Sequence, residues 1–406
     1  MPKGFRPPKP NFLSLGIGRL VTGPALRWIY GIVGIEYKDE DLARFRTIQE
    51  DRIMVAPNHP TNAEPVVMFH LSRVVRRRFY FVSNRESFDR VFGLFGKLLQ
   101  SWGAYSIIRG APDRESFKFT RRLLASHRSK LVIFPEGEVY SQNDTLLPFH
   151  DGVFQLAMGA AEDMKRDGID SPLWVLPVAV KYRYVGDARR QIHRSLNRLE
   201  TALGILRDKK STQYERLAEA GNRLLSSAEA AYHLKKAPDA SMQVRIDEVR
   251  EAIIGRVSDA LGIAREPVDT PLPDRMRRLY NEVYVVISGE ESVESVYDAR
   301  LALEERNRVQ PMLDDLKRLA NWVAVRETYV AQKPSVERYI DTLRRMEIEV
   351  HGKVRIKAKK ICLVRIGEPI DARSFGPDYA QDRKRTVAKF TDVVEGRVQA
   401  LLDSMH

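Results

Sequence analysis

The chain is 406 residues long, with 43% hydrophobic and 30% charged residues, which excludes a disordered protein and leaves material for two or three domains. Its formal charge of +13 and pI near 9.7 favour anionic partners such as phospholipid surfaces, nucleic acid or phosphate-bearing substrates. The single cysteine, Cys362, excludes an intrachain disulfide, and its apolar neighbours predict an inert buried position.

Residues 1–45 are predicted to be amphipathic helices that associate with a membrane. The apolar stretch 12–37 contains Arg19 and Arg27, so it is a poor bilayer-spanning helix. We expect two short helices hinged at Gly23-Pro24, with apolar side chains toward lipid: Phe12, Leu13, Leu15, Ile17, Leu20, Trp28, Ile29 and Ile32. The basic flanks suit an anionic lipid surface. The alternative is an arm that packs on the protein's own core.

Residues 46–184 alternate between short apolar runs and longer helical patterns. The predicted strands are 52–56, 79–83, 104–108, 131–134 and 174–180, and the predicted helices are 64–75, 91–99, 113–126 and 152–166. This alternation predicts an α/β fold in which helices flank a mixed sheet. Ligands in such sheets bind beyond the carboxyl ends of the strands.

Residues 185–350 are predicted to be a helical insertion. Apolar residues recur there at spacings of three and four, as in Leu196, Leu199, Leu203 and Leu206, and again from Ile246 to Ala260. Breaks are expected at 237–239 and 267–273. Residues 351–406 then supply a strand at 361–366 and an amphipathic helix at 387–401, which we expect to rejoin the α/β domain.

The stretch Asn58-His59-Pro60-Thr61-Asn62-Ala63-Glu64 places a histidine between a predicted strand and a predicted helix, with a carboxylate five positions later. In this pattern His59 is a candidate general base and Glu64 the group that fixes its tautomer. The alternative is a capping box, in which Glu64 accepts a hydrogen bond from the amide of Thr61.

Three further stretches end or interrupt predicted strands. Phe134-Pro135-Glu136-Gly137 exposes a carboxylate and a flexible backbone, and its alternative is an ordinary turn. Arg109 ends a strand and suits a phosphate or carboxylate, although a surface ion pair is the alternative. Pro177 lies inside a strand that lines either an acyl or acceptor site or plain core.

Taken in order, NHPTNAE, GAYSIIR, FPEGEVYS and VLPVAV resemble the four blocks of the phospholipid/glycerol acyltransferase family. The resemblance covers roughly residues 50–184 and 354–402. It implies that His59 is the base, that Glu64 replaces the family's usual aspartate, and that the substrates contact these residues: Asn58, Arg109, Glu136, Gly137 and Pro177. It implies no metal, no cofactor and no covalent enzyme intermediate.

The resemblance implies transfer of a fatty acyl group from acyl-CoA or acyl-carrier protein to a hydroxyl of a glycerolipid or lysophospholipid. We therefore expect a peripheral or monotopic enzyme on the cytoplasmic face of an anionic membrane, with no nucleic-acid partner. Basic runs at 73–78 and 353–360 suit lipid, the phosphates of coenzyme A or a solvated surface. The third block lacks the usual arginine and has Glu138, which disfavours lysophosphatidic acid as acceptor. The alternatives are a weakly active membrane-bound interaction protein and a thioester hydrolase.

Overall fold

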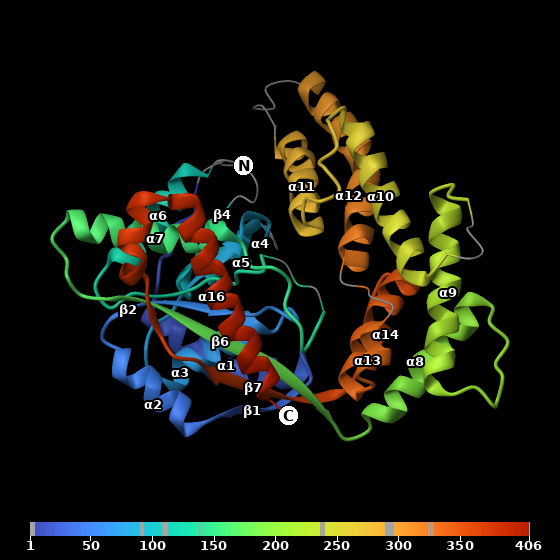
Figure 1. Cartoon of the computed structure of the whole chain (residues 1–406), viewed down its shortest axis with the longest axis horizontal. Coiled ribbons are helices and arrows are strands. Elements are labelled where there is room, and N and C mark those ends of the chain that lie inside the picture. Colours follow the sequence, from blue (N-terminus) through green and yellow to red (C-terminus); the bar gives the residue numbers. More distant parts are fainter. Residues whose placement is uncertain are drawn as a thin grey trace. The chain divides into compact units, whose positions relative to one another are not determined.

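A computed structural model describes residues 5–89, 93–107, 113–137, 139, 141–235, 240–288, 296–323, 325 and 328–405. The chain forms two compact units (Figure 1). Residues 1–186 and 359–406 make up the first unit, and residues 187–358 make up the second. The first is an α/β unit, whereas the second is helical.

The first unit is built on a mixed sheet, as predicted, and this sheet has eight strands. Its strands are β1 (Ile32–Tyr37), β2 (Arg52–Pro57), β3 (Tyr80–Asn84), β4 (Ala104–Ile107), β5 (Lys130–Val132), β6 (Leu173–Val185), β7 (Lys359–Ile366) and β8 (Ile370–Asp371). The order is β1-β7-β6-β2-β5-β3-β4, and β8 pairs with β6. Strands β6, β2, β5, β3 and β4 are parallel, so their carboxyl ends share one edge. Strand β7 is antiparallel to β6.

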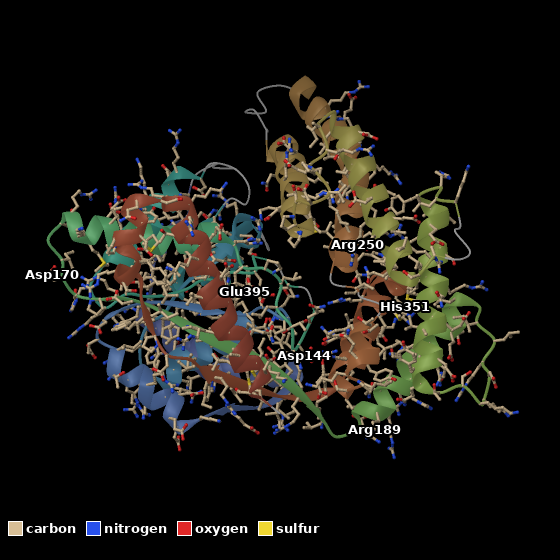
Figure 2. The ribbon with its side chains drawn as sticks, in the orientation of Figure 1. Asp144, Asp170, Arg189, Arg250, His351 and Glu395 are labelled. Carbon is tan, nitrogen blue, oxygen red and sulfur yellow. The ribbon has the colours of Figure 1, made fainter. Side chains whose placement is uncertain are left out.

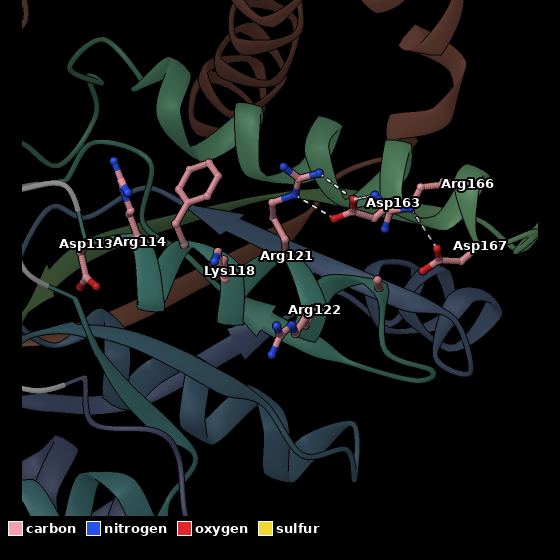
Figure 3. Close-up of a pocket in the computed structure, with 10 residues that line it drawn as sticks. Asp113, Arg114, Lys118, Arg121, Arg122, Asp163, Arg166 and Asp167 are labelled. Atoms are coloured by element: carbon pink, nitrogen blue, oxygen red, sulfur yellow. Dashed lines mark hydrogen bonds and ion pairs between the residues drawn. The ribbon is translucent and has the colours of Figure 1, made fainter.

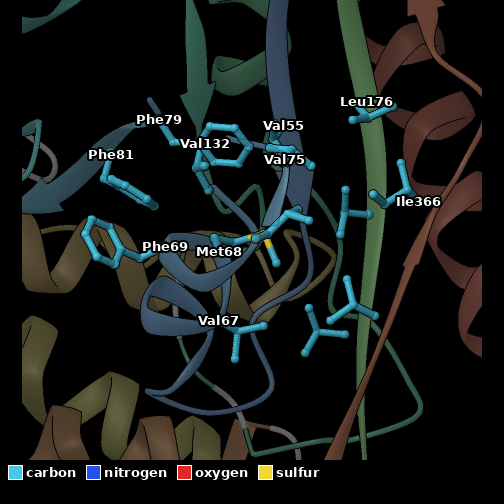
Figure 4. Close-up of a cluster of buried hydrophobic side chains, with 14 of the residues drawn as sticks. Val55, Val67, Met68, Phe69, Val75, Phe79, Phe81, Val132, Leu176 and Ile366 are labelled. Atoms are coloured by element: carbon cyan, nitrogen blue, oxygen red, sulfur yellow. The ribbon is translucent and has the colours of Figure 1, made fainter. Parts of the chain in front are cut away.

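Helices cover both faces of this sheet, because the central strands are apolar on both sides. On β2, Ile53 and Val55 enter one apolar cluster, whereas Met54 and Ala56 enter the other. The first cluster (Figure 4) receives α1 (Phe12–Trp28), α2 (Asp39–Ile48), α3 (Glu64–Val74) and α4 (Arg85–Asp89). The second receives α6 (Arg114–Ala125), α7 (Asp151–Arg166), α15 (Gly376–Gln381) and α16 (Arg383–Asp403). Helix α5 (Leu94–Ser101) packs beside α4.

The N-terminal segment differs from the prediction of two hinged helices. Helix α1 is continuous with Pro24 inside it, and residues 32–37 form strand β1 rather than helix. Leu15, Gly18, Thr22 and Leu26 form a buried stripe at spacings of three and four, which holds α1 against the domain as one helix. Leu15 and Ile32, which were expected to face lipid, are therefore buried in the core.

The second unit consists of α8 (Ala188–Leu203), α9 (Gln213–Ala231), α10 (Met242–Leu261), α11 (Leu272–Ser288), α12 (Val296–Val323), α13 (Thr328–Gln332) and α14 (Val336–His351). Leu206 was predicted to be part of an apolar stripe, but α8 ends at Leu203 and Leu206 is exposed. The break expected at 237–239 lies outside the described residues. Arg250, labelled in Figure 2, donates hydrogen bonds to the carbonyls of Trp322 and Val325 and so caps the end of α12.

Candidate active site

His59 lies two residues beyond β2, at the edge where the parallel strands end. Its imidazole Nδ1 is 2.7 Å from the Glu64 carboxylate, and its ring stacks on Phe134 with 4.2 Å between ring centroids. The side chain of His59 is 14% exposed, whereas that of Glu64 is fully buried. Within the described part of the chain, the imidazole Nε2 has no partner. The lone pair of Nε2 is therefore available to a substrate proton when Nδ1 carries the ring hydrogen.

Four donors hold the Glu64 carboxylate. Besides the imidazole, Oε2 accepts from the backbone N–H of Thr61 at 2.9 Å. Oε1 accepts from the Thr61 hydroxyl at 2.7 Å and from the hydroxyl of Tyr182. Helix α3 begins at Glu64 with Ala63 as its N-cap, so the motif is not a capping box, in which the glutamate is the third helical residue. The hydrogen bond from the backbone N–H of Thr61 to Glu64 is nevertheless present, and the same carboxylate oxygen, Oε2, also bonds to the imidazole of His59.

Glu136 joins the loop after β5 to the loop after β2. Its Oε1 accepts from the backbone N–H of His59 at 2.7 Å, and its Oε2 accepts from the backbone N–H of Leu147 at 3.1 Å. Burial raises the pKa of Glu136 to about 7, although both amide donors act in the opposite direction. The sequence suggested that Glu136 contacts the acceptor. In the structure one of its oxygens holds the backbone of His59 and the other holds the backbone of Leu147.

Gly137 lies in a tight turn whose left-handed backbone conformation favours glycine. Its φ is +71°, and a Cβ there would lie 2.8 Å from the imidazole of His150. Gly137 was expected to contact substrate, but its N–H donates to the carbonyl of Phe134 at 3.1 Å. The backbone N–H of Gly137 is therefore used within the turn. Gly137 shapes the loop and does not present this N–H to a substrate.

Two asparagines fasten the loops to the edge of β6. Strand β2 pairs with β6 only as far as Val178, so the next backbone groups of β6 need other partners. The amide of Asn58 exchanges two hydrogen bonds with the backbone of Val180, at 2.9 and 2.6 Å. Asn143 does the same with the backbone of Tyr182, at 2.6 and 2.7 Å. Asn58 was predicted to bind substrate, but in the structure its side chain is buried and both polar atoms of its amide bond to β6.

Pro177 is buried within β6. Its carbonyl accepts from the N–H of Gly367, in the turn between β7 and β8. The nitrogen and the carbonyl of a strand residue point to the same side, so the nitrogen of Pro177 also faces this turn. No backbone N–H is needed there for a hydrogen bond between strands, so a proline is tolerated. This placement agrees with the alternative that the strand around Pro177 belongs to the core. Arg109, Glu138 and Tyr140 lie outside the described residues.

Tyr182 and Lys360 are site residues that the motifs did not indicate. Burial raises the pKa of the Tyr182 hydroxyl well above its usual value, and the charge of Glu64 adds to this effect. The Nζ of Lys360 lies 3.7 Å from the centroid of the Tyr182 ring. Val178, Val180 and Tyr182 alternate along β6 and so lie on the same side of the sheet as α3. This alternation is the sequence pattern from which the place of Tyr182 could have been predicted.

The end of α1 lies close to this site. Tyr30 follows α1, and its pKa is raised by burial and by the negative charge of Glu64. Cys362 is buried in the same core, as predicted. Among the described residues no group of three or more His, Cys, Asp or Glu side chains is arranged to hold a metal ion.

Comparison with known families is consistent with this geometry. Residues 35–181 match the family model described as Acyltransferase. This range contains the strands β2 to β5, parts of β1 and β6, and the His59–Glu64 pair. No curated protein matches the chain significantly. Residues 35–181 thus form an acyltransferase domain, and the chain is an acyltransferase enzyme.

Proposed function

We propose that the enzyme transfers a fatty acyl group from a thioester to a hydroxyl of a glycerolipid or lysophospholipid. The observation that carries this proposal is the His59–Glu64 pair at the carboxyl edge of the sheet, with Nδ1 bonded to the carboxylate and Nε2 open among the described residues. A histidine in this state accepts a proton from an alcohol and donates it again.

The reaction has two proton transfers at one atom. As the acceptor hydroxyl attacks the thioester carbonyl, its proton moves to Nε2 of His59, and a tetrahedral oxyanion forms. When this intermediate collapses, the carbon–sulfur bond breaks and the same Nε2–H protonates the leaving thiolate. Glu64 stabilises the transient imidazolium through Nδ1, and its position is fixed by Thr61 and Tyr182.

Our proposal for the acceptor rests on two differences between the third block of this chain and that of the family. Both carboxylate oxygens of Glu136 and the backbone N–H of Gly137 form hydrogen bonds within the protein. In our proposal these two residues therefore shape the site and do not contact the acceptor. Arg109 is left as the proposed contact for an anionic group of the acceptor. With Glu138 in place of a neutral residue and no further arginine, we propose an acceptor whose phosphate is shielded by a head group.

We also propose that α1 docks the enzyme on an anionic membrane at the cytoplasmic face. Helix α1 presents large exposed apolar side chains, among them Phe12 (81% exposed), Leu13 (80%), Leu20 (73%) and Trp28 (83%). The Arg78 guanidinium lies 5.0 Å from the Phe12 ring centroid, so a cation borders this surface. In the described part of the chain, every helix is too short or too polar to cross a bilayer. An apolar helical face bordered by cations is typical of interfacial binding.

The chemical proposal is tested with purified protein, radiolabelled acyl-CoA or acyl-carrier protein, and a panel of lysolipids in liposomes. We expect esterified product with the native enzyme and at least about a hundredfold less with His59→Ala. Release of free fatty acid without ester would show hydrolysis instead. Equal turnover by the native enzyme and His59→Ala would refute the role of His59.

The membrane proposal is tested by liposome sedimentation. Phe12→Asp, Leu20→Asp and Trp28→Asp replace exposed side chains and leave the buried stripe of α1 intact. We expect the triple variant to lose binding to anionic liposomes, because each carboxylate replaces an apolar contact and repels the lipid charge. Leu206→Asp, at a position that is 97% exposed in the helical unit, is the control for placing a carboxylate at another exposed apolar position. Undiminished sedimentation of the triple variant would refute the proposal.

A further inference from the structure

A surface groove of about 850 Å³ lies between α6 and α7 (Figure 3). None of its lining residues belongs to the His59 site. Its floor is rigid, because Arg121 donates to Asp163 at 2.9 Å and to the carbonyl of Gly159 at 2.8 Å. Arg166 pairs with the same aspartate, at 3.1 Å. These cations are therefore neutralised within the groove.

Three other cations of the groove are not neutralised. Arg114, Lys118 and Arg122 are exposed, and no carboxylate pairs with them in the described part of the chain. They occupy positions i, i+4 and i+8 of α6, so they form a row about 12 Å long with one cation per turn. Phe117 lies on the same side of the helix and is 38% exposed. The row thus combines repeated positive charge with an apolar contact.

This row does not belong to the surface that we propose for lipid. Helix α1 packs on the apolar cluster at one face of the sheet, whereas α6 packs through Leu124 on the cluster at the opposite face. A flat bilayer that contacts the exposed side of α1 is therefore on the far side of the sheet from α6. The groove needs a different anionic partner.

We propose that Arg114, Lys118 and Arg122 are a docking surface for an acidic α-helix of a protein partner. A helix with carboxylates at every fourth residue repeats its charges at the same distance as the row, whereas a single phosphate engages cations that converge on one point. Helix α6 follows the loop after β4, so the row starts at the edge of the sheet where His59 lies. A docked partner is therefore close to the catalytic edge.

The test measures binding of the full-length enzyme to a fluorescent helical peptide with Glu at every fourth position, by anisotropy at low ionic strength. We expect Arg114→Glu/Lys118→Glu/Arg122→Glu to raise the Kd at least about tenfold, and added salt to weaken native binding. Lys384→Glu/Arg385→Glu/Arg397→Glu makes the same charge change at exposed residues of α16, none of which lines the groove, and should leave the Kd near its native value. Replacing the three α6 cations with Gln should give an intermediate Kd.

Several results would overturn the proposal. One is that the native enzyme does not bind the peptide. Another is that a peptide with Gln in place of Glu binds equally well. A third is that the α6 and α16 variants lose peptide binding to the same extent. The same holds if the α6 reversal weakens binding of coenzyme A or anionic vesicles while peptide binding persists. His59→Ala should bind the peptide normally, so failure of the proposed chemistry and failure of this docking surface are distinguishable.

Discussion

Replacing Glu64 by aspartate, the usual residue of the family, should impair this enzyme. The shorter side chain would withdraw its carboxylate by about one carbon–carbon bond, roughly 1.5 Å, from donors that now lie 2.7 to 2.9 Å away. The contact with the imidazole of His59 would lengthen to as much as roughly 4 Å, beyond hydrogen-bond distance. A lost charge-assisted hydrogen bond costs about 1.5–3 kcal/mol, so we expect kcat to fall roughly 10- to 150-fold.

The assay compares kcat and KM of Glu64→Asp with the native enzyme, using the acyl donor and acceptor that give turnover. The matched control is Glu347→Asp in the helical unit, since Glu347 is also fully buried and also has four donors, Ser195, Arg198 and the amides of residues 355 and 356. Glu347→Asp should lower thermal stability but leave kcat unchanged. Native or higher kcat in Glu64→Asp would refute the view that this site is built around the longer side chain.

Three further predictions concern the groups around the pair. Tyr182→Phe removes one donor from Glu64 but leaves Thr61, so kcat should fall roughly tenfold with KM unchanged, and an unchanged kcat would exclude a positioning role. Glu136 has a folded pKa of about 7 against an ordinary value of 4.5, so the native state keeps a proton that the unfolded state loses. Its contribution to the free energy of unfolding should therefore fall by about 3 kcal/mol as pH rises from 4.5 through 7, and urea titrations should show a smaller fall for Glu136→Gln. Gly137→Ala should destabilise the protein by about 1–3 kcal/mol in thermal melts, because φ is positive and the new methyl group meets His150, and an unchanged Tm would contradict this.

The fold was predictable to the extent that burial follows the sequence pattern. The run Ile53-Met54-Val55-Ala56 is apolar throughout because β2 is covered on both faces, and the alternation of such runs with helices indicated an α/β sheet. Strand β1 was missed because the run Ile32–Tyr37 continues an apolar stretch that begins in α1. Only pairing with β7, more than three hundred residues away in the sequence, makes it a strand.

The proximity of His59 and Glu64 follows from local spacing, since both belong to one strand-to-helix connection. The functions of their neighbours depend on long-range contacts that spacing does not encode. The resemblance implied that Asn58 contacts substrate, but the end of β2 leaves backbone groups of β6 that its amide satisfies. Tyr182 was missed for the same reason, because its hydroxyl reaches Glu64 from a strand 118 residues away in the sequence.

The helical unit enters and leaves the α/β unit at two residues that face each other. Val185 at the end of β6 pairs with Lys359 at the start of β7, so all of residues 187–358 occupy the place of a hairpin turn. The entropy cost of closing a connection grows only slowly with its length, by about 0.6 kcal/mol for each doubling. The helical segment can therefore change in length or sequence while β6 and β7, and with them the catalytic scaffold, keep their register.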